Sequence, residues 1–158
     1  MFDQPSPMRR EEWPQRLLTD RLFFAIFPDA VTAARIARLR EALYLELGLR
    51  GKPLATERLH ATLHHVGDYA GLPLDIVASA GDAASAVAMP PFTVAFDGAE
   101  SFRGRPGHRP FVLRGEDGVA DRRVDTVSWA VHEFVLVHSL LGRSRYNVLA
   151  RFPLRAQA

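Results

Sequence analysis

The chain of 158 residues contains no cysteine. Disulfide bonds, zinc–thiolate sites and cysteine nucleophiles are therefore excluded, and the absence fits a reducing cytoplasm. The chain also lacks an apolar run near the ~20 residues that a membrane-spanning helix needs. Its polar N-terminal residues show no apolar core of a signal peptide. We therefore expect a cytoplasmic protein that does not bind a membrane.

Lysine is almost absent, because Lys52 is the one lysine among 20 basic residues. Arginine is well suited to bidentate phosphate contacts. Residues 1–100 hold 10 basic and 13 acidic residues, whereas residues 101–158 hold 10 basic and 5 acidic residues. The basic C-terminal part fits either a phosphate-bearing partner or a solvated basic surface.

The hydrophobic pattern predicts an α+β domain of mostly antiparallel strands with two helices packed outside them. Strands are expected at residues 22–27, 59–66, 92–97, 110–114, 129–138 and 146–152. Helices are expected at residues 29–47 and 73–88. Residues 115–128 are polar and irregular, so we expect a loop there. We expect residues 1–20 to form an N-terminal arm and residues 21–158 to form the domain.

The segment that carries chemistry contains His60 and Thr62. Alternate residues of a strand share a face, so His60, Thr62 and His64 are expected on one face and His65 on the other. Histidine exchanges a proton near neutral pH, and a threonine hydroxyl donates a hydrogen bond to a phosphoryl oxygen. By spacing alone, His-x-Thr is a weak signal, since both residues also occur in strands with structural roles.

Other candidates are weaker than this pair. His64 either lines a cleft beside His60 or is solvated. Arg143 and Arg145 flank a predicted hairpin turn, where they either contact a polyanion or face solvent. A metal site at the three histidines is not expected, since His65 lies on the wrong face and no acidic residue is adjacent.

Three ordered blocks then point to a family. These are LFFAIFPD at residues 22–29, RLHATLHHVGD at 58–68 and EFVLVHSLLGRSRYNVLARFPL at 133–154. Together they resemble the first strand, the first His-x-Thr signature and the C-terminal hairpin of the two-histidine (2H) phosphoesterases. This family includes 2′-5′ RNA ligases and RNA 2′,3′-cyclic phosphodiesterases. The family usually has an aromatic residue where this chain has His65.

The resemblance implies a bilobal fold in which each lobe contributes one His-x-Thr/Ser motif to a cleft. It implies that His60 is a catalytic acid or base and that Thr62 binds the substrate phosphate. It also implies no metal and no cofactor. The expected substrates are RNA ends with 2′-5′ linkages, or a small cyclic nucleotide with a 2′,3′-cyclic phosphate.

The chain departs from the family because no second His-x-Thr/Ser motif occurs in it. About 14 residues join the strands expected at 110–114 and 129–138, too few for the family's helix, strand and turns. A segment therefore looks absent near Ala120-Asp121, by omission, by natural deletion or by engineering. We expect a truncated second lobe, whose exposed sheet edge a second copy could cover in a homodimer.

The sequence leaves three functions open. The first is a phosphodiesterase that uses His60 for acid–base catalysis. The second is a degenerate module that binds RNA or a nucleotide phosphate without turnover. The third, a structural remnant without a ligand, is disfavoured because His60 and Thr62 are retained together with their flanking sequence.

Overall fold

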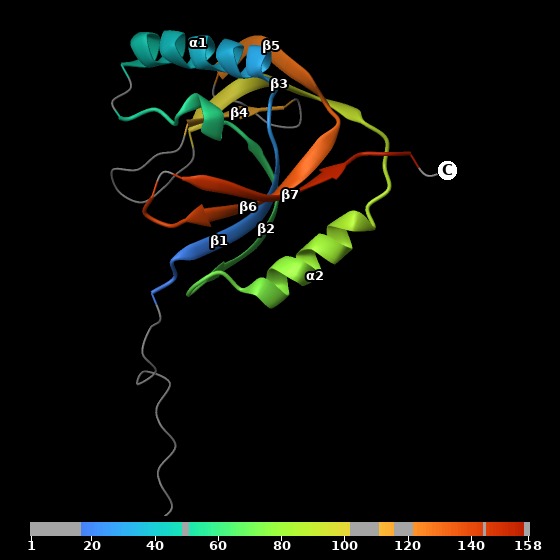
Figure 1. The fold of residues 1–158 in the computed structure, drawn as a ribbon. Coiled ribbons are helices and arrows are strands. Elements are labelled where there is room, and N and C mark those ends of the chain that lie inside the picture. Colours follow the sequence, from blue (N-terminus) through green and yellow to red (C-terminus); the bar gives the residue numbers. More distant parts are fainter. Residues whose placement is uncertain (1–16, 49–50, 102–110, 116–121, 144, 157–158) are drawn as a thin grey trace, which may run out of the picture.

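The computed structural model describes residues 17–48, 51–101, 111–115, 122–143 and 145–156. Within them the chain forms two antiparallel sheets and two α-helices (Figure 1). The elements are β1 Asp20–Ile26, α1 Ala30–Leu47, the 3-10 turn η2 Thr56–Arg58, β2 Ala61–Tyr69, α2 Leu74–Ser85, β3 Phe92–Ser101, β4 Phe111–Arg114, β5 Arg122–Val131, β6 Glu133–Leu140 and β7 Tyr146–Pro153.

The first sheet has four strands in the order β2-β1-β6-β7. Strand β1 is central, and five of its seven residues are buried, as the apolar run of the sequence predicts. On one side it pairs with β2, and on the other with β6 near the C-terminus. The first and last parts of the chain therefore build one sheet together.

The second sheet has three strands in the order β4-β3-β5. Within the described residues it carries no strand or helix between β4 and β5, which is consistent with a partial second lobe. Residues 116–121, including the predicted join at Ala120-Asp121, lie outside the described residues.

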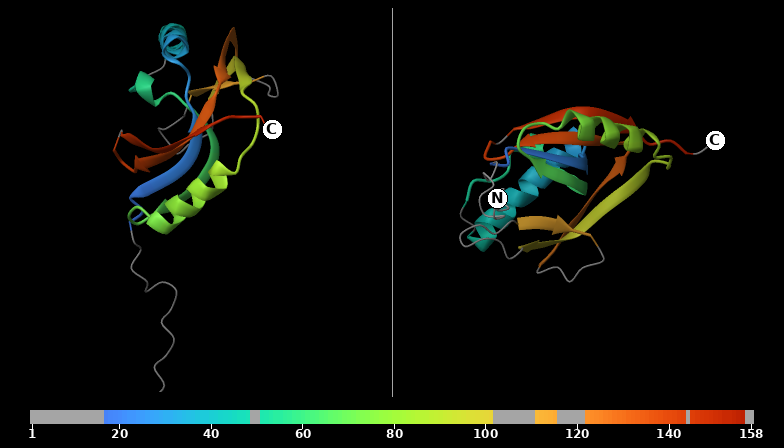
Figure 2. Two further views of the ribbon diagram at one scale, coloured as in Figure 1. Left: turned by 45° about the vertical axis from the view of Figure 1, so that its right-hand side comes forward. Right: turned by 90° about the horizontal axis from the view of Figure 1, so that it is seen from below.

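The two helices lie against different parts of the molecule (Figure 2). Helix α2 covers one face of the first sheet, where Val77, Ala80 and Ala84 pack against its core. Helix α1 lies beside the second sheet, where Glu46 forms an ion pair with Arg122 of β5. Its ends follow the sequence signals, because the Asp29 carboxylate accepts a hydrogen bond from the Thr32 N–H at 2.9 Å and Gly48 adopts φ 60°.

Two predictions for the C-terminal half are wrong. Residues 115–128 are not all loop, since β5 begins at Arg122. The single strand expected at 129–138 is two strands that belong to different sheets. Val131 pairs with Phe92 in the second sheet, and Glu133 pairs with Pro153 in the first. The chain passes between sheets at His132, whose carbonyl accepts a hydrogen bond from the Leu154 N–H at 2.8 Å.

The alternation of β6 divides the core between the two faces of the first sheet. Phe134 and Leu136 face a large cluster that also holds Trp129 of β5 and the packing residues of α2. Val135 and Val137 face the opposite side, in a smaller cluster with Phe23 and Ala25. The larger cluster joins both sheets, and the smaller one forms the floor of the site described below.

Three further sequence predictions concern the N-terminal arm, the homodimer and the membrane. Residues 1–16 of the predicted N-terminal arm lie outside the described residues, and β1 begins at Asp20 within the arm's predicted limits. The homodimer stays a prediction. Among the described helices, none has the length and apolar character needed to cross a membrane.

Candidate active site

An irregularity in β2 decides on which face of the sheet its two histidine side chains lie. Ala25 of β1 pairs with Thr62, Phe24 with His64 and Phe23 with His65, so Leu63 is an extra residue between two paired positions. Such a bulge reverses the alternation of faces beyond it. Thr62 and His65 therefore share the face of Ala25 and Phe23, whereas His64 lies opposite. The predicted faces are correct for His60 and Thr62 and wrong for His64 and His65.

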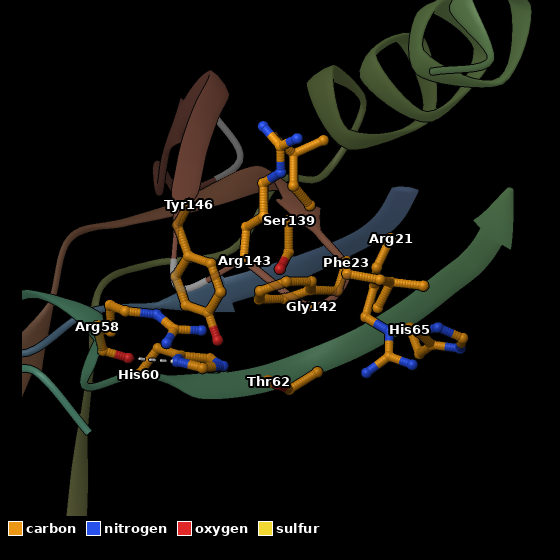
Figure 3. A pocket seen from close by; sticks show the side chains of 12 residues that line it. Arg21, Phe23, Arg58, His60, Thr62, His65, Ser139, Gly142, Arg143 and Tyr146 are labelled. Atoms are coloured by element: carbon orange, nitrogen blue, oxygen red, sulfur yellow. Dashed lines mark hydrogen bonds between the residues drawn. The ribbon is translucent and has the colours of Figure 1, made fainter. Parts of the chain in front are cut away.

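This face of the sheet forms an open pocket (Figure 3). Its walls come from β1, the segment before β2, β2 itself and the β6–β7 hairpin. The lining residues are Arg21, Phe23, Arg58, His60, Thr62, His65, Ser139, Leu140, Leu141, Gly142, Arg143 and Tyr146. Residues from both ends of the chain thus meet at one site because β1 lies between β2 and β6.

The imidazole of His60 has a defined orientation and protonation pattern. Its Nδ1 lies 2.7 Å from the carbonyl oxygen of Arg58. A carbonyl only accepts hydrogen bonds, so Nδ1 carries the proton and the neutral ring keeps its lone pair on Nε2. Burial lowers the pKa of His60 below its usual value, against the raising effect of the bond to Arg58. The ring is therefore a neutral base at physiological pH.

Aromatic rings fix His60 in place. The centroids of Phe23, Tyr146 and Phe27 lie 5.2, 5.3 and 5.9 Å from that of the imidazole. The guanidinium carbon of Arg58 lies 4.2 Å from the centroid of Tyr146, a cation–π arrangement. Tyr146 is not among the site residues that the sequence predicts. Its contact with His60 depends on the β6–β7 pairing, which no local motif reveals.

A second charged group lies at the other end of the pocket, around Asp68. Arg21 donates two hydrogen bonds of 2.7 Å to the two carboxylate oxygens of Asp68. His65 Nε2 lies 3.0 Å from Oδ1 of the same carboxylate. The Arg21 guanidinium is the main cause that holds the pKa of Asp68 far below its usual range, with a smaller contribution from His65. Asp68 is thus an anion that accepts hydrogen bonds from the side chains of both Arg21 and His65.

The remaining predicted site residues divide between the pocket and its surroundings. Arg143 lines the pocket, whereas Arg145, two residues along the same hairpin, is not among the lining residues. His64 is also absent from the lining. Among the described residues, no cluster of three or more histidine, aspartate or glutamate side chains is arranged to hold a metal ion.

Comparisons with known proteins agree with this architecture. Residues 26–112 match the family model described as LigT like Phosphoesterase. The apo structure of E. coli LigT is 23% identical, with a TM-score of 0.65, and the match covers 87% of this chain and 99% of LigT. LigT in complex with 3′-AMP is 23% identical, with a TM-score of 0.63 and coverage of 86% and 98%.

A protein of Thermus thermophilus is 26% identical, with a TM-score of 0.59 and coverage of 87% of this chain and 100% of its own. No curated protein matches the chain by sequence. The predicted α+β fold of the 2H phosphoesterase type is confirmed by these structural matches.

Proposed function

Because the chain belongs to the LigT-like phosphoesterase family, we propose that it hydrolyses a phosphodiester at the His60 pocket without a metal ion. The proposed substrate is a 2′,3′-cyclic phosphate or a 2′-5′-linked RNA end. His60 accepts a proton from the attacking water, and Thr62 donates a hydrogen bond to a phosphoryl oxygen. Both roles use groups that line one pocket.

The observation that carries the proposal is the 2.7 Å contact between His60 Nδ1 and the Arg58 carbonyl oxygen. It assigns the proton to one ring nitrogen and leaves Nε2 as the base. The aromatic rings around His60 remove water from it, which lowers its pKa and keeps this nitrogen unprotonated. A base that is oriented and largely neutral before substrate arrives is what general base catalysis requires.

Positive charge around Thr62 supports a phosphate as the ligand. Arg58 and Arg143 line the same pocket as Thr62, and arginine pairs well with phosphoryl oxygens. The Nε of Arg58 is buried without a hydrogen-bond partner among the described residues. A bound phosphate would supply acceptors near this side chain. The LigT complexes with ATP and 3′-AMP support a nucleotide-like ligand.

The experiment that tests the proposal is hydrolysis of 2′,3′-cyclic AMP in the presence of a metal chelator. We expect turnover by the natural chain and a loss of about 10²-fold or more in kcat for His60→Gln. His64→Gln is the matched control, because it alters a histidine of the same strand that faces away from the pocket. Equal rates for the natural chain and His60→Gln would overturn the assignment.

A second candidate function is a binding module that holds an RNA end or nucleotide phosphate without turnover. The observation in its favour is that the sequence contains one His-x-Thr motif where the family has two. The pocket arginines would provide the affinity, so binding should weaken as salt increases. Salt-sensitive binding of 3′-AMP with no hydrolysis of the cyclic nucleotide would favour this function over the enzyme.

A further inference from the structure

The pocket contains a second histidine that the His-x-Thr motif does not include. His65 lies on the same face of β2 as Thr62 because of the bulge at Leu63. Its side chain is 53% exposed and lines the pocket with His60. The two imidazoles are held through different ring nitrogens. His60 Nδ1 donates to the Arg58 carbonyl, whereas His65 Nε2 contacts the Asp68 carboxylate.

We propose that His65 is the second proton-transfer group of this site and that the Asp68–Arg21 pair positions it. This inference rests on the proposed function, since it assigns the acid of the same reaction. It assigns the role of the missing second motif to a residue of β2, the strand that also carries Thr62. His65 donates its proton to the oxygen that leaves phosphorus, while His60 takes the proton of the attacking water.

The spacing along β2 supports this assignment. Thr62 and His65 pair with Ala25 and Phe23, which are alternate residues of β1. They are therefore about 7 Å apart along the strand, the rise of two residues. Thr62 lies between His60 and His65 in the pocket (Figure 3). A phosphate on the Thr62 hydroxyl would have one histidine on each side.

This arrangement suits an in-line displacement, in which the attacking and leaving oxygens lie on opposite sides of phosphorus. Water forms the new P–O bond as its proton passes to His60 Nε2. One P–O bond of the cyclic phosphate breaks, and the ribose oxygen takes a proton from His65. Exchange with solvent then removes the proton from His60 and returns one to His65, so the cycle needs no other reactant.

Asp68 gives His65 a fixed orientation. In the imidazolium form of His65, which is the form that acts as an acid, the Asp68 carboxylate accepts the Nε2–H and the Nδ1–H remains free for donation. The carboxylate itself is held by two hydrogen bonds from Arg21, so its position does not depend on His65. Asp68 is therefore a positioning residue that acts through His65.

The test compares two substrates that differ in their need for an acid. A 2′,3′-cyclic nucleotide expels a ribose alkoxide, which needs a proton, whereas bis(p-nitrophenyl) phosphate expels a nitrophenolate, which leaves without one. We expect His65→Gln to lower kcat for 2′,3′-cyclic AMP about 10²-fold or more and to change kcat for the nitrophenyl ester by less than about fivefold. His60→Gln should slow both substrates, and His64→Gln neither.

Asp68→Asn provides a second variant with a different readout. It should lower kcat for the cyclic nucleotide with little change in KM and little effect on the nitrophenyl ester. In combination with His65→Gln it should cause no further loss. A merely structural or electrostatic role of Asp68 would slow both substrates alike. The ratio of the two rates is independent of the fraction of protein that folds, so partial misfolding does not hide the result.

The possible failures are distinguishable. If His65→Gln slows both substrates equally, or neither, while His60→Gln slows both, the role of His65 is overturned and the proposed function stands. If the natural chain hydrolyses neither substrate, or His60→Gln hydrolyses both at the natural rate, the proposed function fails and the role of His65 falls with it.

Discussion

Asp20 and His138, which are 118 residues apart in the chain, meet inside the protein with the carboxylate Oδ1 at 2.5 Å from the imidazole Nε2. Both residues are buried. Thr19 and the backbone N–H of Gly71 donate hydrogen bonds to the other carboxylate oxygen. The contact joins the start of β1 to β6. It therefore links the N-terminal and C-terminal parts of the first sheet beneath the strands that form the pocket.

This pair predicts a dependence of stability on pH. The hydrogen bond from Thr19, followed by that from His138, lowers the pKa of Asp20 below its value of 3.8 in the unfolded chain. The resulting stabilisation is present above pH 3.8 and is lost as pH falls through the lower, folded-state pKa. Asp20→Asn should therefore lower the melting temperature at pH 7, and the difference from the natural chain should shrink below pH 3.8. Thermal unfolding followed by circular dichroism measures this.

The control for Asp20 is Asp125→Asn on an exposed position of β5. A surface substitution of this kind should change stability by no more than about 0.5 kcal/mol. A melting temperature of Asp20→Asn equal to that of the natural chain at pH 7 would show that the Asp20–His138 contact does not stabilise the fold.

Leu136 provides a test of the core that joins both sheets. Its side chain is fully buried on β6, within the cluster that holds Trp129 and Phe152. Leu136→Ala should lower the free energy of unfolding by about 2–5 kcal/mol, because it leaves a cavity in a packed region. Val148→Ala, on the neighbouring strand but 42% exposed, should cost less than about 1 kcal/mol. Equal losses in urea unfolding would contradict the assignment of the core.

The pKa of His60 predicts the acid side of the rate profile. Burial lowers this pKa below 6.5, and the reaction requires the neutral ring. On the acid side of the profile, kcat/KM should therefore fall with a midpoint below 6.5. Phe27→Ala should let water reach the ring, since Phe27 contacts His60, and should raise the midpoint toward 6.5. A midpoint at or above 6.5 in the natural chain would contradict a desolvated base.

Thr62 is expected to act through its hydroxyl. Thr62→Val keeps the shape of the side chain and removes the donor, which should reduce transition-state stabilisation by about 1.5–3 kcal/mol if the acceptor is a charged phosphoryl oxygen. Thr62→Ser keeps the donor and should retain most of the activity. The measured quantity is kcat/KM for 2′,3′-cyclic AMP. Similar losses in both variants would point to packing by the methyl group.

The sequence predicts most of the first sheet and both helices because their signals are local. The apolar run of β1, the Asp29 cap and the Gly48 terminus each specify structure within a few residues. The boundary between β5 and β6 was missed, since Trp129 and Phe134 belong to the same cluster and apolar residues continue on both sides. Only the polar residues His132 and Glu133 interrupt the apolar run. Polar residues at such positions are also common where one strand faces solvent, so they do not by themselves indicate a boundary between two strands.

The site was predicted in part for a similar reason. His60 and Thr62 share a local motif, so their proximity follows from strand geometry. His65 was assigned to the wrong face because a bulge depends on pairing with β1 rather than on the residues of β2 alone. Arg21 and Tyr146 reach the pocket from distant parts of the chain. The acidic Asp68, three residues after His65, was the one local signal of a charged partner.

The central claim is that His60 makes this pocket a phosphodiesterase site. Its most direct test is ³¹P NMR of 2′,3′-cyclic AMP incubated with the natural chain and with His60→Gln, both in the presence of a metal chelator. The claim predicts that the natural chain converts the cyclic phosphate resonance into a monoester resonance, whereas His60→Gln leaves it almost unchanged over the same time. Persistence of the cyclic resonance with the natural chain, or equal conversion by His60→Gln, would contradict it.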